Sequence, residues 1–376
     1  MRFGWMTLAH SPSPAHDARA IFEQLEQATL AEELGFDGVW LTEHNFTGES
    51  VYADPIPFAA ALAMRTQRIR IGFAVIQMAL RHPVRLATQL SLLDNLTGGR
   101  LDIGVGRGSI FNEYEFVGYG LRSEGARERM AEALEVMTRA WTAAPLDFKG
   151  RYFTLRLPEL RPAPVQRPHP PIWHSVASAA SFHRCGEKAV PILTVRLPLG
   201  EVGRRLAQYA EGLSRSGLDA AAQRGLLQQA AIWRWVYVGE SRAAAEDDLV
   251  AALVPTRRHM MHARDAFNPG DFRADPALLN PWTDPDQSEE EAIRYALRTG
   301  TLIGTARDVA DQVAELRDAG AGHLLCQMSF GYLDHERIKR SMRRFGETVI
   351  PAFREAGAGG RDWAAAAAIA DPPRQD

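Results

Sequence analysis

The sequence contains only two cysteines, Cys185 and Cys326, among its 376 residues. They lie far apart and form no CxxC pair, which argues against a zinc site and against a disulfide framework. Free cysteines of this kind fit the reducing environment of the cytoplasm. We therefore expect a cytoplasmic protein that binds no metal.

The sequence also lacks long apolar runs and an excess of charge of one sign. No uninterrupted apolar stretch reaches the ~18 residues that a membrane-spanning helix needs, and residues 1–8 resemble a strand and not a signal segment. The 43 basic and 46 acidic side chains leave a formal net charge of −3. Because nucleic-acid and polybasic membrane surfaces need a basic excess, we expect neither kind of partner.

Short apolar runs alternate along the chain with segments of helical character. The apolar runs predict strands at residues 2–8, 38–41, 69–76, 100–105, 172–175, 190–195, 230–238 and 323–328. The helices are expected at residues 17–34, 57–65, 83–95, 125–141, 179–185, 200–214, 241–253, 306–319 and 334–353. Strands separated by helices in this way indicate a (β/α)₈ TIM barrel. A doubly wound open sheet is the alternative.

Two segments fall outside this alternation. Residues 255–287 show neither a helical nor a strand period, and a long loop inside a compact domain is usually functional. We expect this segment to be an insertion before the eighth strand that closes over the site as a lid. Residues 1–356 should form a single domain, and residues 357–376 a loose C-terminal tail.

Polar residues follow several of the predicted strands, at the end where a parallel barrel carries its chemistry. Residues 42–45 read Thr-Glu-His-Asn directly after the second strand. His44 is therefore a candidate for proton transfer, with a polar loop after a buried strand as the alternative. Weaker candidates for contact with a substrate are His174, Arg196, His259 and His262.

Two strand ends carry the residue types of a phosphate site. Residues 104–109 read Gly-Val-Gly-Arg-Gly-Ser, which places Arg107 next to Gly106. Arginine binds phosphate through paired N–H donors, and glycines let the backbone come close. Ser178 and Ser181 stand at the start of a predicted helix, where hydroxyl and backbone N–H groups bind anions. An ordinary turn and a helix cap are the alternatives.

Residues 35–46, Gly-Phe-Asp-Gly-Val-Trp-Leu-Thr-Glu-His-Asn-Phe, resemble the signature of the bacterial luciferase-like flavin-dependent monooxygenases. Further landmarks follow in the family's order. They are His-Pro-Val-Arg at 82–85, Leu-Leu-Asp-Asn-Leu-Thr-Gly-Gly-Arg at 92–100, Gly-Val-Gly-Arg-Gly at 104–108, Ala-Arg-Glu-Arg at 126–129, Gly-Thr at 304–305 and Ser-Phe-Gly at 329–331. The resemblance covers nearly the whole chain and is specific for the superfamily, not for a substrate.

The resemblance implies a (β/α)₈ barrel that binds FMN, or in a related branch the deazaflavin F420, at the C-terminal ends of its strands. The residues that match the family's phosphate site are Arg107, Arg127, Ser178 and Ser181. Ala74 and Val75 match a non-prolyl cis peptide under the flavin ring, next to the glycine-rich loop with Gly106. His44 matches the histidine that serves as base in the luciferases.

The resemblance further implies an enzyme that oxygenates a small, apolar organic substrate. It would use O₂ and reduced FMN through a C4a-(hydro)peroxide of the flavin, since the cofactor carries the difficult chemistry. A separate flavin reductase would supply the reduced FMN, and relatives are often homodimers. An F420-dependent dehydrogenase or reductase and a non-catalytic flavin-binding barrel are the alternatives.

Three positions depart from the luciferases, which have a second His at Asn45, a Cys at Gly106 and an acidic residue at Ala177. Light emission is therefore not expected. We expect His44 to titrate near the ordinary pKa of ~6.5, so that the neutral imidazole accepts a proton. Because neighbours in an extended segment point to opposite sides, its partner should be a group from another strand end or the flavin itself, and not the adjacent Glu43 or Asn45.

Overall fold

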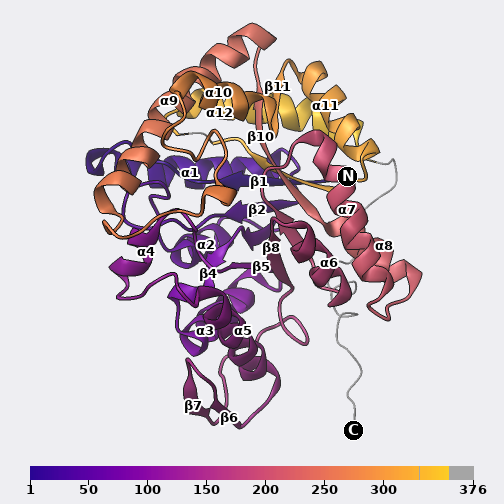
Figure 1. Ribbon diagram of the computed structural model, residues 1–376. Helices are drawn as coiled ribbons and strands as arrows, with labels where there is room; N and C mark the ends of the chain where they lie inside the picture. Colours follow the sequence, from indigo (N-terminus) through magenta and orange to yellow (C-terminus); the bar gives the residue numbers. More distant parts are fainter. Residues whose placement is uncertain (330, 355–376) are drawn as a thin grey trace.

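In the computed structural model, which describes residues 1–329 and 331–354, parallel strands form a closed barrel (Figure 1). Its eight strands are β1 (Arg2–Thr7), β2 (Gly38–Leu41), β3 (Arg70–Phe73), β5 (Leu101–Gly106), β8 (Ile172–Val176), β9 (Ile192–Thr194), β10 (Ala231–Val238) and β12 (His323–Gln327). Strand β10 pairs with both β12 and β9, and this second pairing closes the ring. The predicted (β/α)₈ barrel is confirmed, and the open sheet is excluded.

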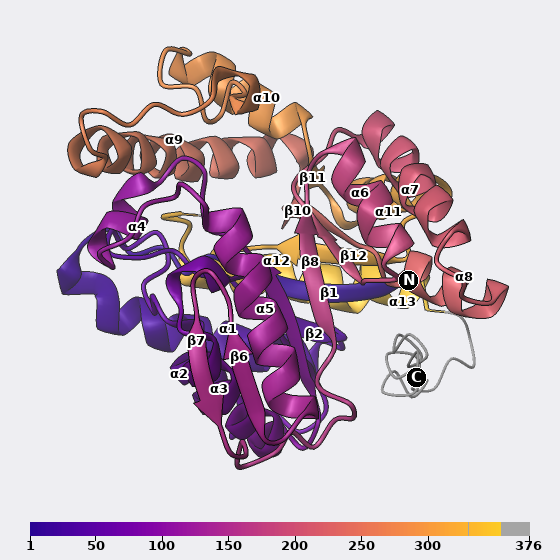
Figure 2. The same cartoon turned by 60° about the horizontal axis from the view of Figure 1, so that its bottom comes forward.

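Helices surround the barrel (Figure 2). Those that alternate with its strands are α1 (Asp17–Glu33), α2 (Pro55–Ala63), α3 (Pro83–Thr97), α5 (Ala126–Thr142), α6 (Ala179–Glu187), α7 (Leu199–Ser214), α11 (Ala306–Asp318) and α12 (His335–Arg344). The closing helix continues through a π-helical turn (Phe345–Val349) into α13 (Ile350–Ala352). Within the described residues, no helix combines the length and the apolar character that crossing a membrane requires. The predicted tail at 357–376 lies outside the described residues.

Helix ends follow signals in the sequence. Helix α3 begins at Pro83, and Gly98 after its last residue takes a left-handed conformation with φ 62°. Proline suits the first helical turn because its N–H would have no partner there, and glycine suits a left-handed cap because it has no Cβ. Helix α1 is likewise followed by Gly35, with φ 82°. These caps fix where each following strand begins, and so where its C-terminal end emerges.

Two tryptophans fill the interior of the barrel below its C-terminal end. The rings of Trp40 and Trp173 meet edge to face with centroids 5.3 Å apart. Gly4 and Gly72 stand beside Trp40, and a Cβ on either one would lie within 2.6 Å of its ring. Glycine is therefore required at both positions to admit the indole. The interior between the described strands is a packed core, so a ligand of the barrel interior would have to bind at the mouth.

Several elements were not predicted. They are β4 (Ile76–Gln77), helices α4 (Glu113–Gly118) and α8 (Ala220–Gln229), the hairpin of β6 (Leu146–Lys149) and β7 (Thr154–Leu157), and strand β11 (Thr301–Gly304). Strand β11 extends the sheet along the second half of β10 and is not one of the barrel strands. The strand is short. Gly300 precedes it and Gly304 is its last residue, both with positive φ. Two glycines so close together are typical of a turn, so the sequence did not indicate a strand.

Residues 255–287 were expected to lack regular structure, and this prediction was wrong for residues 255–267, which are helical. Helix α9 runs from Arg242 to Phe267 with Pro255 inside it. Proline normally interrupts a helix, but here contacts with other parts of the fold keep the chain helical on both sides of Pro255. Leu253 and Thr256 are buried on either side of Pro255, and Arg257 donates hydrogen bonds to the carbonyl oxygens of Asp284 and Gln287. A loop with one 3₁₀ turn (Pro276–Leu278) then leads to α10 (Glu289–Arg298), which contacts α9.

Candidate active site

A cavity of about 130 Å³ opens at the mouth of the barrel. Its lining comes from the C-terminal ends of strands on all sides of the ring: Met6, Leu8, Thr42, His44, Ala74, Val75, Ser175, Leu193, Thr194, Val195, Trp233 and Leu325. Most of these side chains are apolar, and His44 is the one titratable group among them. The structure thus brings His44 together with Ala74 and Val75, the residues that the resemblance to the family had assigned to the flavin ring.

The peptide bond between Ala74 and Val75 is cis, although neither residue is proline. It lies between β3 and β4, where the predicted third strand is interrupted. Gly106, at the end of the adjacent β5, lies beside the Val75 side chain. A Cβ on Gly106 would lie 2.5 Å from Cγ2 of Val75, so the Val75 side chain occupies the space that a larger residue at position 106 would need.

His44 lies between two buried carboxylates. Its Nδ1 is 3.1 Å from Oε1 of Glu115, and its Nε2 is 3.7 Å from Oε1 of Glu49. Burial by itself would lower the pKa of His44, but the nearby Glu49 and the hydrogen bond to Glu115 outweigh it and raise the pKa to about 9. The expectation of an ordinary pKa was therefore wrong, and the imidazole carries a proton at neutral pH.

Further hydrogen bonds hold Glu115 in place. Its Oε1 accepts from Nδ2 of Asn112 at 2.9 Å, and its Oε2 accepts from Nε2 of Gln77. Gln77 also donates to the backbone oxygen of Glu43 at 2.8 Å. These contacts join helix α4 to the ends of β2 and β4, so the carboxylate that faces His44 has little freedom to move away.

The two residues beside His44 have other partners, in agreement with the alternation expected for an extended segment. Glu43 is buried and forms an ion pair with Arg81 at 2.8 Å. The Oδ1 of Asn45 accepts a hydrogen bond from the Tyr119 hydroxyl at 2.9 Å. Both contacts hold the loop after β2 against neighbouring elements, and neither residue is hydrogen-bonded to the imidazole. The partners of His44 are instead Glu49, in the loop after β2, and Glu115, in helix α4, so the expectation of a partner from another strand end was wrong.

Two arginines lie close together near the end of β5. Burial and the positive charge of Arg127 lower the pKa of Arg107. Neither guanidinium forms a hydrogen bond or an ion pair with any side chain in the described part of the chain. Two neighbouring cations without an acidic partner repel each other, so an anion between them would stabilise both.

Ser178 and Ser181 form the beginning of α6. The Ser178 hydroxyl accepts a hydrogen bond from the Ser181 N–H at 3.3 Å, and so caps the helix. Strand β5 pairs with β8 such that Val105 stands opposite His174. Arg107 and the residues that lead into α6 therefore emerge from neighbouring strand ends. Cations, small hydroxyl side chains and a helix N-terminus thus follow neighbouring strand ends, and this set of donors suits a phosphate group.

Helix α9 reaches over the mouth from the opposite side. The Nε2 of His259 lies 2.7 Å from the backbone oxygen of Thr47, and Arg264 donates to Oδ1 of Asn112 at 3.1 Å. His262 is exposed on another face of the helix. Sequence reasoning missed Glu49, Glu115 and Arg264. Nothing local singles them out, because their importance lies in electrostatic interactions with His44 and with one another across the fold.

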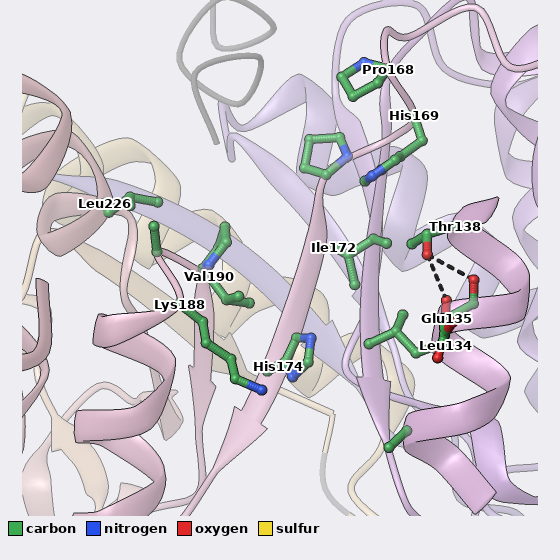
Figure 3. Close-up of a pocket in the computed structure, with 14 residues that line it drawn as sticks. Leu134, Glu135, Thr138, Pro168, His169, Ile172, His174, Lys188, Val190 and Leu226 are labelled. Atoms are coloured by element: carbon green, nitrogen blue, oxygen red, sulfur yellow. Dashed lines mark hydrogen bonds between the residues drawn. The ribbon is translucent and has the colours of Figure 1, made fainter. Parts of the chain in front are cut away.

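A larger cavity of about 370 Å³ lies on the outer wall of the barrel, between α5 and the segment around Lys188 (Figure 3). His174 faces this cavity and not the mouth, because Trp173 beside it points into the barrel. Burial, assisted by Lys188, lowers the pKa of His174 to about 4. The suggestion that His174 contacts a substrate at the mouth was therefore wrong. The smaller cavity is the candidate active site, because it holds the strand-end groups.

Comparison with known proteins gives a consistent result. The profile of the family described as luciferase-like monooxygenase matches residues 1–323. A 4-hydroxyprotoasukamycin monooxygenase from Streptomyces nodosus subsp. asukaensis is 31% identical over 89% of this chain and 87% of its own length. The oxygenase component of a flavin-dependent trigonelline monooxygenase from Acinetobacter baylyi is 24% identical over 94% and 96%. The oxygenating constituent of 3,6-diketocamphane monooxygenase from Pseudomonas putida, solved with FMN, has the same fold, with a TM-score of 0.73, 20% identity and coverage of 93% and 98%.

Proposed function

This chain belongs to the luciferase-like monooxygenase family, as its sequence predicted, and on this premise we propose that it uses reduced FMN and O₂ to oxygenate a small organic substrate. The observation that carries the proposal is the mouth of the barrel. There a protonated histidine and a cis peptide line one apolar cavity. Two arginines that have no acidic partner in the described chain follow the adjacent strand end, one in the loop after β5 and one at the start of α5.

We assign the phosphate of FMN to Arg107, Arg127, Ser178 and Ser181. The assignment is supported by the mutual repulsion of the two guanidinium groups, which a dianionic phosphate would relieve. The hydroxyls of the two serines stand at the N-terminus of α6, where the helix dipole favours negative charge. The flavin ring would then extend toward Ala74, Val75 and Gly106.

His44 holds the proton that the reaction needs near the ring. With a pKa of about 9, the imidazole is charged at neutral pH and donates a proton more readily than it accepts one. Glu115 orients the ring through Nδ1, and Glu49 faces the other nitrogen. The role that we propose for His44 is therefore a proton donor and a positive charge beside the cofactor.

Bound FMN in its reduced form supplies the activation of O₂. The residues of this chain position the substrate and keep water away. Apolar side chains such as Met6, Leu193 and Leu325 line the cavity, and a dry site prevents side reactions. Helix α9 contributes His259 and Arg264 above the mouth, so we propose that residues from this helix to α10 act as the lid.

The test is turnover with reduced FMN and O₂ over a panel of small organic compounds, with mass spectrometry to detect one added oxygen atom. In this assay a separate flavin reductase supplies the reduced FMN, an arrangement that we also propose for the protein itself because one relative is the oxygenase component of a flavin-dependent monooxygenase. Reduced F420 without O₂ serves as the parallel arm, since a dehydrogenase or reductase on this barrel would move a hydride instead. Product formation only with F420 would contradict the proposal. Sedimentation of the purified protein tests for the expected homodimer.

A further inference from the structure

Arg196 lies two residues beyond the end of β9 and follows Thr194 and Val195, which line the mouth cavity. No acidic side chain in the described part of the chain pairs with it. Its Nη1 atom is buried and makes no hydrogen bond to any described residue. Arg205, Arg234 and Arg264 also leave one buried nitrogen without a partner, but each of these side chains makes another hydrogen bond. For Arg196 neither a hydrogen bond nor an ion pair joins the guanidinium to the described chain.

Two indole rings hold the Arg196 guanidinium in position. Its Cζ lies 3.6 Å from the centroid of Trp235 and 5.5 Å from that of Trp233. Both indole N–H groups donate to Oε1 of Gln327 at 3.0 Å, which fixes the orientation of the rings. A guanidinium stacked on an aromatic face keeps its N–H edges available for a ligand in its own plane.

The position of Arg196 links this cation to the active site. Thr194 and Val195, immediately before it on the chain, line the mouth cavity, and so does Trp233. Burial lowers the pKa of Arg196 to about 9, and among the described residues Tyr295 opposes this effect while the positive charge of Arg234 adds to it. The side chain is still charged at neutral pH, and a buried charge without a partner is unfavourable until an anion joins it.

We propose that Arg196 binds a carboxylate of the substrate, so that the enzyme acts on small aromatic or apolar organic acids. The proposal rests on the function proposed above and names the substrate class of the same site. The carboxylate would accept two N–H bonds from the guanidinium, while the apolar body of the acid contacts Trp233 and the cavity beside it. Arg107 and Arg127 are assigned to the flavin phosphate and do not compete for this group.

The experiment measures binding of benzoate and of benzamide, its neutral analogue, by calorimetry at constant ionic strength. Wild-type protein should bind benzoate about 10- to 100-fold more tightly, the range expected for hydrogen bonds to a charged group. Arg196→Met should abolish this preference, and Arg196→Lys should keep part of it. Arg204→Met removes a highly exposed arginine of α7 and should change nothing.

Three results would overturn the proposal. They are equal binding of the two probes by the wild type, a preference that persists in Arg196→Met, and loss of FMN binding in Arg196→Met and Arg196→Lys, which would make the residue part of the cofactor site. Circular dichroism checks that each variant is folded. Because binding is measured without turnover, an acid preference with no oxygenated product would disprove the proposed function and leave the carboxylate site standing. Oxygenation with no acid preference would support the proposed function and disprove the carboxylate site.

Discussion

The Nδ1 atom of His44 lies 3.1 Å from Oε1 of Glu115, a residue 71 positions further along the chain. The Glu115 side chain is fully buried, and that of His44 is 25% exposed. The pair places a negative charge behind the imidazole, on the side away from the mouth cavity that His44 lines. Together with the nearby Glu49, it therefore raises the pKa of the residue that the sequence alone made the main catalytic candidate.

Glu115→Gln should lower the pKa of His44 from about 9 toward its ordinary value of ~6.5, because the amide carries no charge to stabilise the imidazolium. Nuclear magnetic resonance of labelled histidine across a pH series measures this directly. Since the folded pKa lies above the unfolded one, the stabilisation from His44 is fully present below pH ~6.5 and is lost as the pH rises through about 9. Glu113→Gln is the control, since Glu113 contacts Ser123 instead. A His44 that titrates near 6.5 in the wild type would refute the pairing.

His44→Ala should retain FMN binding and lose about 10²–10⁴-fold in oxygenation, the usual effect of removing one acid–base group. In the wild type, turnover should fall on the alkaline side as His44 loses its proton near pH 9. Flavin affinity and product yield are measured separately across the pH range. An unchanged yield in the variant would mean that His44 is structural, and loss of FMN binding would mean that it places the cofactor.

Arg107→Ala and Arg127→Ala should each weaken FMN binding while leaving riboflavin binding almost unchanged, because only FMN carries the phosphate. A loss of about 10-fold or more is expected for a charge-assisted contact. Fluorescence titration with both flavins gives the comparison, and Arg122→Ala, a nearby exposed arginine, is the control. Equal affinity of the wild type for FMN and riboflavin would show that the phosphate site is assigned wrongly.

Gly106→Ala should disturb the mouth of the barrel, because the added Cβ would lie 2.5 Å from Cγ2 of Val75. We expect a destabilisation of about 1–3 kcal/mol, typical of overpacking, together with weaker FMN binding. Gly225→Ala in α8 meets no atom within 4 Å and should be neutral or slightly stabilising. Thermal unfolding of both variants is measured side by side. Equal melting temperatures would count against close packing at position 106.

Asn268→Ala should loosen the segment after α9. Oδ1 of Asn268 accepts from the Tyr114 N–H at 3.1 Å, and its Nδ2 donates to the Phe111 carbonyl at 3.0 Å. These bonds hold the segment to the loop after β5. Limited proteolysis should cut residues 268–288 faster in the variant, and added FMN should slow cleavage of the wild type if this segment is the lid. Arg273→Ala, whose hydrogen bonds stay within its own segment, is the control. Identical cleavage with and without flavin would argue against a lid.

Local patterns were sufficient for the barrel and for the place of its chemistry. Alternating apolar runs located all eight barrel strands, and glycine and proline marked the ends of α1 and α3. Local patterns gave wrong predictions where contacts between distant parts of the chain outweigh the local preference for helix, strand or turn. Helix α9 continues through Pro255 because its face is buried and Arg257 bonds to the following segment. Strand β11 forms because it pairs along β10.

The sequence by itself determined that His44 ends a buried strand at the mouth, and that Arg107 and Ser178 follow neighbouring strands. Only the tertiary structure decided what surrounds them. Glu115 meets His44 and raises its pKa, and Arg196 is left charged on an aromatic surface. The physical reason is that backbone propensity and hydrophobic period act over a few residues, whereas the charge state of a side chain depends on every buried group near it in space.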